Sequence, residues 1–138
     1  QGSTVFHSAA GLGNEAVLSV LLDRVDYVDH RSNDGATPLH RAAVCGHVEA
    51  ASLLLRSRAD IAARKNDGAT ALHLAARFGH TLMVSLLKEL NADAEATDCE
   101  GQTPLKLASI GCHLEAQEVL ETASSYEQEA DWETADTL

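Results

Sequence analysis

The sequence predicts an all-α solenoid of about four stacked helix-turn-helix units, and two observations carry that prediction. First, the chain repeats itself every 33 residues, because residues 34–66 and 67–99 align without a gap and share 16 identical positions. Second, only 4% of the 138 residues are aromatic while 45% are hydrophobic, so the core must be built from alanine, leucine and valine. This composition disfavours a sandwich of β-sheets packed around aromatic side chains.

The same step of 33 residues extends the repeat in both directions from the aligned pair. Downstream it reaches the segment that begins at Glu100, and upstream it reaches Gly2. Residues 124–138 leave the pattern and form an acidic tail with no basic residue. We therefore expect one repeat domain over residues 1–123, with units at about 1–33, 34–66, 67–99 and 100–123.

Each unit predicts a turn, a first helix, a second helix and a loop, in that order. A threonine stands where its hydroxyl can cap the first helix, and both prolines of the chain follow at the first helical position. A glycine can end this helix in the left-handed conformation, and paired apolar residues such as Leu53-Leu54 give the second helix its buried face. Asp-Gly pairs before the caps indicate tight turns. The threonines are Thr4, Thr37, Thr70 and Thr103, the prolines are Pro38 and Pro104, and the glycines are Gly13, Gly46 and Gly79.

These motifs resemble the ankyrin repeat. Thr37-Pro38-Leu39-His40 is followed by Gly46-His47 and Ala59-Asp60, and residues 70–93 repeat the pattern with Ala71 in place of proline. The resemblance covers about nine-tenths of the chain. It implies a non-catalytic module that binds other proteins.

Three departures from the pattern carry expectations about local geometry. Lys106 stands where the other units have histidine, which in the family supports hydrogen bonds between repeats, so we expect looser packing of the fourth unit. Gly111-Cys112 reverses the order of the second unit, so we expect the turn there to shift by one residue. Arg58 and Asn91 stand at a glycine position of the family, where arginine in the left-handed region costs about 1 kcal/mol.

Composition excludes several other classes of protein. A net charge of −11, from 21 acidic and 10 basic residues, disfavours a general nucleic-acid binder. No apolar run approaches 18 residues, so we expect no membrane insertion. An odd number of cysteines, three, fits a reducing compartment, so we expect an intracellular protein, cytoplasmic or nuclear. Six of the seven histidines fall at repeat positions and do not converge, so we expect no metal site, no cofactor and no catalytic residue.

By the resemblance, the chain is expected to bind a protein or peptide through the concave face and the hairpin tips. Apolar residues at the ends of the first helices and arginines on the middle units favour a hot spot for a partner, which the arginines suggest is acidic. Two alternatives stay open: loops or an adjoining repeat cover the apolar residues, or the basic residues pair with Asp34, Asp67 and Glu100. The candidate residues are Leu12, Arg31, Asn33, Arg41, Val44, Cys45, Arg64, Asn66, Arg77, Phe78, Cys99 and Ile110.

The two ends of the chain carry expectations of their own. Residues 17–22 of the first unit are largely apolar, as in an internal repeat, so we expect further sequence before Gln1. The tail has three interpretations: a short helix from Ser125 that covers the last repeat, a disordered segment, or a ligand for an arginine-lined groove. The last of these would allow self-association through the tail.

Two other functions remain beside a binding module. The chain is alternatively a targeting or regulatory ankyrin segment of a larger enzyme or channel. A catalytic protein is disfavoured, because neither a glycine-rich phosphate loop nor a nucleophile–base pair stands out in the sequence.

Overall fold

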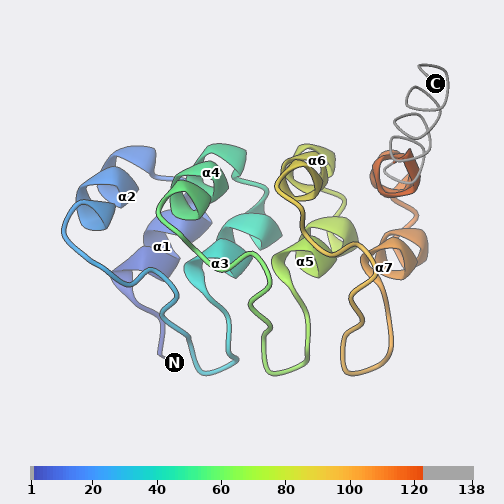
Figure 1. Cartoon of the computed structure of the whole chain (residues 1–138), viewed down its shortest axis with the longest axis horizontal. Coiled ribbons are helices and arrows are strands. Elements are labelled where there is room, and N and C mark those ends of the chain that lie inside the picture. Colours follow the sequence, from blue (N-terminus) through green and yellow to red (C-terminus); the bar gives the residue numbers. More distant parts are fainter. Residues whose placement is uncertain (1, 123–138) are drawn as a thin grey trace, which may run out of the picture.

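A computed structural model of the chain describes residues 2–122, and these residues form a stack of helix pairs without a strand (Figure 1). The prediction of an all-α solenoid is confirmed. The tail, with its three interpretations and the proposed self-association, lies outside the described residues. Residues 114–122 are helical and follow the last of the labelled helices. Those helices are α1 (Val5–Leu12), α2 (Glu15–Leu22), α3 (Pro38–Cys45), α4 (Val48–Arg56), α5 (Ala71–Arg77), α6 (Thr81–Glu89) and α7 (Pro104–Ile110).

The helices lie in two rows that follow the order of the chain (Figure 1). Helices α1, α3, α5 and α7 pack side by side in one row, and α2, α4 and α6 pack in the other. Three loops project beyond the first row, each closed by a bond between backbone groups four residues apart. We call them the first, second and third hairpins, at residues 31–36, 64–69 and 97–102. The hairpins and the exposed side of the first row together form one surface, called the hairpin face below.

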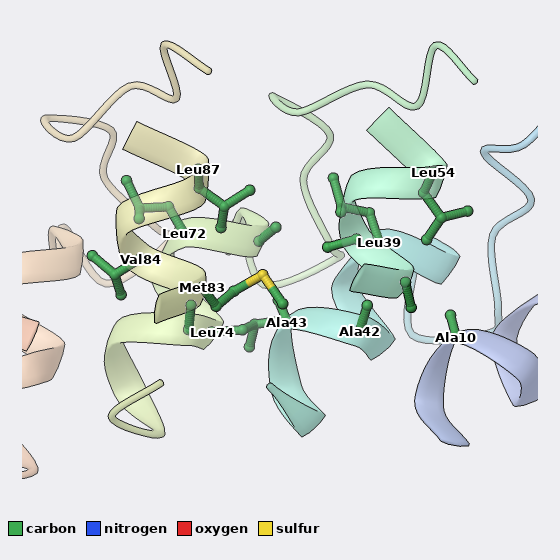
Figure 2. Close-up of a cluster of buried hydrophobic side chains, with 14 of the residues drawn as sticks. Ala10, Leu39, Ala42, Ala43, Leu54, Leu72, Leu74, Met83, Val84 and Leu87 are labelled. Atoms are coloured by element: carbon green, nitrogen blue, oxygen red, sulfur yellow. The ribbon is translucent and has the colours of Figure 1, made fainter. Parts of the chain in front are cut away.

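Small residues on the first row and larger ones on the second build the core between the rows. Ala42, Ala43 and Ala75 are fully buried, which lets adjacent helices of the first row approach closely. Figure 2 shows this layer, with Leu54 and Leu87 reaching in from the second row. The core is one continuous cluster along the stack, so each unit is stabilised by its neighbours.

The predicted helix starts are observed. The Thr37 and Thr70 hydroxyls each accept a bond from a backbone N–H three residues on, and Thr103 does the same with Lys106 at 3.2 Å. The helix that follows Thr4 begins without such a side-chain cap. Pro38 opens α3 at its first position, where no N–H is needed. Helix starts are therefore fixed by local sequence in the second to fourth units.

The turn after α7 does not shift by one residue, so that expectation was wrong. Cys112 takes the left-handed conformation, with φ of 58°, in register with Gly79 at 72°, while Gly111 has φ of −80°. The reason is that the backbone N–H of His113 still donates to Ala108, at 3.0 Å, as the equivalent N–H does in the unit before. Nε2 of His113 also donates to the carbonyl oxygen of Arg77, at 3.0 Å, and together these bonds offset the cost of a left-handed cysteine, about 1–2 kcal/mol.

The other left-handed positions are where the sequence indicates. Arg58 has φ of 72° and Asn91 has φ of 68°. Each follows a second helix, α4 or α6, and allows the chain to turn back toward the next hairpin. The arginine lacks the local hydrogen-bonding amide that makes asparagine tolerant of this conformation.

Candidate functional site

Histidines hold the hairpins against the first row of helices. The Nδ1 atom of His40 lies 3.0 Å from the backbone nitrogen of Thr37, which can only donate, so Nδ1 accepts and the ring proton is on Nε2. That Nε2–H donates to the carbonyl oxygen of Ala69 in the second hairpin, at 3.1 Å. Burial lowers the pKa of His40 to about 4, so the ring is neutral near pH 7. His7 and His73 make the same two contacts, to Thr4 and Ala36 and to Thr70 and Gln102.

Two of the candidate arginines tie each hairpin to the next. Nη1 of Arg31 donates to the carbonyl of Arg64 at 2.6 Å, and Nη1 of Arg64 donates to the carbonyl of Thr97 at the same distance. The amide of Asn66 likewise donates to the carbonyl of Asn33 at 3.0 Å. These four candidate residues are exposed on the hairpin face, but the bonds already made by three of their side chains stabilise the hairpin stack.

The basic residue that pairs with the hairpin acids is a lysine. Nζ of Lys65 lies 3.7 Å from the carboxylate of Asp34 and 3.9 Å from that of Asp67. The hydroxyl of Ser32, which donates to Asp34, is the main cause that lowers the pKa of this aspartate to about 2. The internal pairing considered above therefore applies to Lys65, whereas Arg31 and Arg64 bond carbonyl groups instead.

Arg41 and Arg77 differ from the other two candidate arginines. No ion pair involves either of them within residues 2–122. Nε of Arg41 is buried and has no hydrogen-bond partner among the described residues. The guanidinium of Arg77 lies over the ring of Phe78, 5.7 Å from its centroid, which is a cation–π distance. Arg41 is half-buried and Arg77 is exposed, so α3 and α5 each offer a partner a positive charge that no acid of residues 2–122 pairs with.

The candidate apolar residues divide into three exposed side chains and one that is partly covered. Leu12, Phe78 and Ile110 are 78%, 48% and 60% exposed. Val44 packs against the core and is half-buried, as an interior position of the stack requires. Cys45 and Cys99 carry exposed free thiols.

A hollow of about 450 Å³ opens on the hairpin face between the third and fourth units. It brings together three of the predicted residues, Arg77, Cys99 and Ile110, and leaves the candidates of the first two units outside. Its lining also includes Leu74 and Leu107, on α5 and α7, which the sequence analysis did not select. The sequence did indicate that both leucines lie on this face, because they share the repeat register of Arg41. The depth of the hollow, however, depends on the position of the third hairpin.

Residues 2–122 contain no group of three or more histidines, cysteines and carboxylates placed to hold a metal ion. None of the helices described there is both long and apolar enough to cross a membrane.

Comparison with known families gives one result. The family model described as ankyrin repeats in three copies matches residues 1–65 and again residues 58–130. A search of the curated proteins found no significant match.

Proposed function

Because the chain belongs to the ankyrin-repeat family, whose members generally bind other proteins, we propose that it is a non-catalytic module that binds a peptide or protein through the hairpin face. One observation carries the choice of face: the hollow of about 450 Å³ lies there, with exposed Ile110 on its lining and exposed Phe78 next to Arg77. Exposed apolar side chains gathered around a hollow are a common feature of partner-binding surfaces.

The hydrogen bonds of the hairpins support this function energetically. Backbone N–H groups of Asn66 and Cys99 donate to the carbonyls of Asp34 and Asp67, at 3.0 and 2.9 Å, so consecutive hairpins are joined directly. A surface held in this way loses little conformational freedom when a ligand binds. Most of the interaction energy is then available for affinity.

The charges of the face limit where an acidic partner can contact it. Arg31 and Arg64 donate hydrogen bonds to carbonyl groups, and Lys65 pairs with two aspartates. These three side chains are therefore less available to bind acidic groups of a partner. We propose that acidic groups of the partner contact Arg41 and Arg77. This places them on α3 and α5, in the middle of the hairpin face.

The proposal is tested by selecting ligands and locating where they bind. A random library of 12-residue peptides displayed on phage is panned against the whole chain, and the affinities of selected peptides are measured by fluorescence anisotropy. Ile110→Glu is expected to weaken binding about tenfold, because it places a charge beside the hollow. Leu82→Glu is the matched control, since Leu82 is a similarly exposed side chain, 75%, on α6 in the other row. Equal effects of both variants, or no selected peptide, would contradict the proposed face.

A further inference from the structure

The three hairpins differ in charge, although they share one backbone arrangement. Their first position holds Arg31, Arg64 and then Thr97, and their fourth position holds an acid in every case, ending with Glu100. The third hairpin also has Asp98 where the second has a lysine. The first two hairpins together therefore carry three basic and two acidic residues, while the third carries two acids and no base.

The acids of the third hairpin are held differently from those of the other two. Oδ1 of Asp98 accepts the backbone N–H groups of Glu100 and Gln102, both at 2.9 Å, so this carboxylate is fixed in place. The side chain of Glu100 is exposed and has neither an ion pair nor a hydrogen bond with any residue from 2 to 122. By contrast, Asp34 and Asp67 share the ammonium group of Lys65. Both acids of the third hairpin line the hollow.

The floor of the hollow is apolar. Leu74 and Leu107 occupy the register that holds Ser8 in the first unit and Arg41 in the second. Ile110 adds an exposed aliphatic side chain beside them. Within the described residues, an aliphatic floor and an unpaired acidic wall therefore occur together only between the third and fourth units.

We infer that this hollow takes a partner segment in which an aliphatic side chain stands next to a lysine or arginine. The aliphatic group contacts Leu107 and Ile110, and the cation pairs with Glu100 beside the fixed carboxylate of Asp98. This deepens the proposed function and rests on it, because it specifies the partner at one end of the same face. Arg77 lines the same hollow from α5, so acidic groups of the partner are attracted to Arg77 and basic groups to the third hairpin.

The charge part is tested by reversing the charge of Glu100, the acid of the third hairpin whose side chain has no partner among residues 2–122. The same phage library is panned against the unchanged chain and against Glu100→Lys, with Glu118→Lys as the control. Glu118 is an exposed acid on the helix at residues 114–122, so the control has the same change in net charge. We expect peptides selected on the unchanged chain to contain Lys or Arg next to an aliphatic residue. Their affinity is expected to fall about tenfold in Glu100→Lys and to be unchanged in Glu118→Lys.

The location is tested by the reactivity of two cysteines. Cys99 lines the hollow, whereas Cys45 lies on α3, and both thiols are exposed. A bound peptide of this class is expected to slow the alkylation of Cys99 by iodoacetamide several-fold and to leave Cys45 unaffected. The two rates are measured in one sample by mass spectrometry of proteolytic fragments.

The outcomes separate this inference from the proposed function. Peptides that lose affinity in Ile110→Glu, but have no basic preference and bind Glu100→Lys equally well, would overturn the inference and keep the binding face. Protection of Cys45 instead of Cys99 would do the same. Peptides that are insensitive to Ile110→Glu, or a failure to select any, would overturn both.

Discussion

Nε2 of His40 donates a buried hydrogen bond of 3.1 Å to the carbonyl oxygen of Ala69, which lies 29 residues later in the chain. Because Nδ1 of the same ring accepts from the backbone N–H of Thr37, both bonds require the neutral imidazole. A proton on Nδ1 would remove the acceptor and place a charge among buried groups. The contact between the second unit and the second hairpin is therefore sensitive to pH.

Acidification is expected to destabilise the fold between pH 6.5 and about 4. Burial lowers the pKa of His40 from 6.5 to about 4, so in this interval the unfolded chain binds a proton that the folded chain does not. The free energy of unfolding falls as pH falls, by up to about 3 kcal/mol for His40. Burial also lowers the pKa of His73, which acts in the same direction. Urea denaturation followed by circular dichroism at several pH values measures the slope.

His40→Gln is the control for this pH dependence. Glutamine can hydrogen-bond but does not titrate, so the variant is expected to be less stable at pH 7 and to lose less on acidification. An unchanged slope would show that other groups cause the effect. Asp34 affects stability in a different pH range. Its pKa is lowered to about 2, so its contribution to the free energy of unfolding is lost only as pH falls below about 4.

Gly79→Val is expected to lower the free energy of unfolding by more than 1 kcal/mol, because valine strains the backbone there and its side chain clashes with a neighbouring one. The glycine has φ of 72°, and a Cβ atom there would lie 2.4 Å from Nδ1 of His113. Gly101→Val provides the matched control, since Gly101 has φ of 76° and open space around it. The control should cost about 1–2 kcal/mol, and Gly79→Val more than that. Equal values in urea denaturation would show that the His113 contact yields without cost.

Arg58→Gly is expected to stabilise the fold by about 1 kcal/mol. The arginine sits at φ of 72°, a conformation that glycine adopts without strain. Asn91→Gly tests the explanation, because asparagine at φ of 68° already tolerates this region and should gain less. The melting temperatures of the two variants give the comparison, and a larger gain at Asn91 would refute it.

Arg64→Ala is expected to lower stability by about 1 kcal/mol. Its Nη1 donates to the carbonyls of Gly68 and Thr97, so the change leaves the second and third hairpins less tightly joined. Arg56→Ala is a suitable control, because Arg56 is exposed on α4 and has no hydrogen bond within the described part of the chain. If both variants have the same melting temperature, the hairpin bonds of Arg64 contribute nothing measurable.

Arg77→Glu is expected to weaken binding of the selected peptides that carry an acidic group, and Phe78→Ala that of selected peptides in general, each by roughly 1–3 kcal/mol. Both residues are exposed, and their cation–π contact is on the surface, so stability should change by less than about 0.5 kcal/mol. Isothermal titration and thermal denaturation measure the two quantities separately. Retention of full affinity by both variants would move the binding site away from α5.

The fold was predictable because the signals that determine it are local and repeated. Thr37, Pro38 and Gly46 stand within one helix length of each other, and their counterparts recur at the same spacing. Cys112 shows the limit of such signals. Local preference favours Gly111 as the left-handed residue, but the backbone bond from His113 to Ala108 requires it one position later.

The candidate site was less predictable because its contacts join residues far apart in the sequence. The pattern places Arg64 on the hairpin face, but its bond to Thr97 depends on how two hairpins stack. The hollow likewise depends on the third hairpin, which His73 holds through Gln102 at 2.9 Å. The binding role of the twelve candidate residues stays a prediction.

The bonds between units have one more consequence, which concerns how such a chain changes over generations. His7 reaches 29 residues ahead, Arg31 reaches 33 and His80 reaches back 36, so each link spans about one repeat. Duplicating or deleting a block of 33 residues would leave every remaining link with the same separation. The number of repeat units can therefore change while the fold stays the same. A single substitution, such as the threonine at position 97 where the other hairpins have arginine, can then give one unit its own specificity.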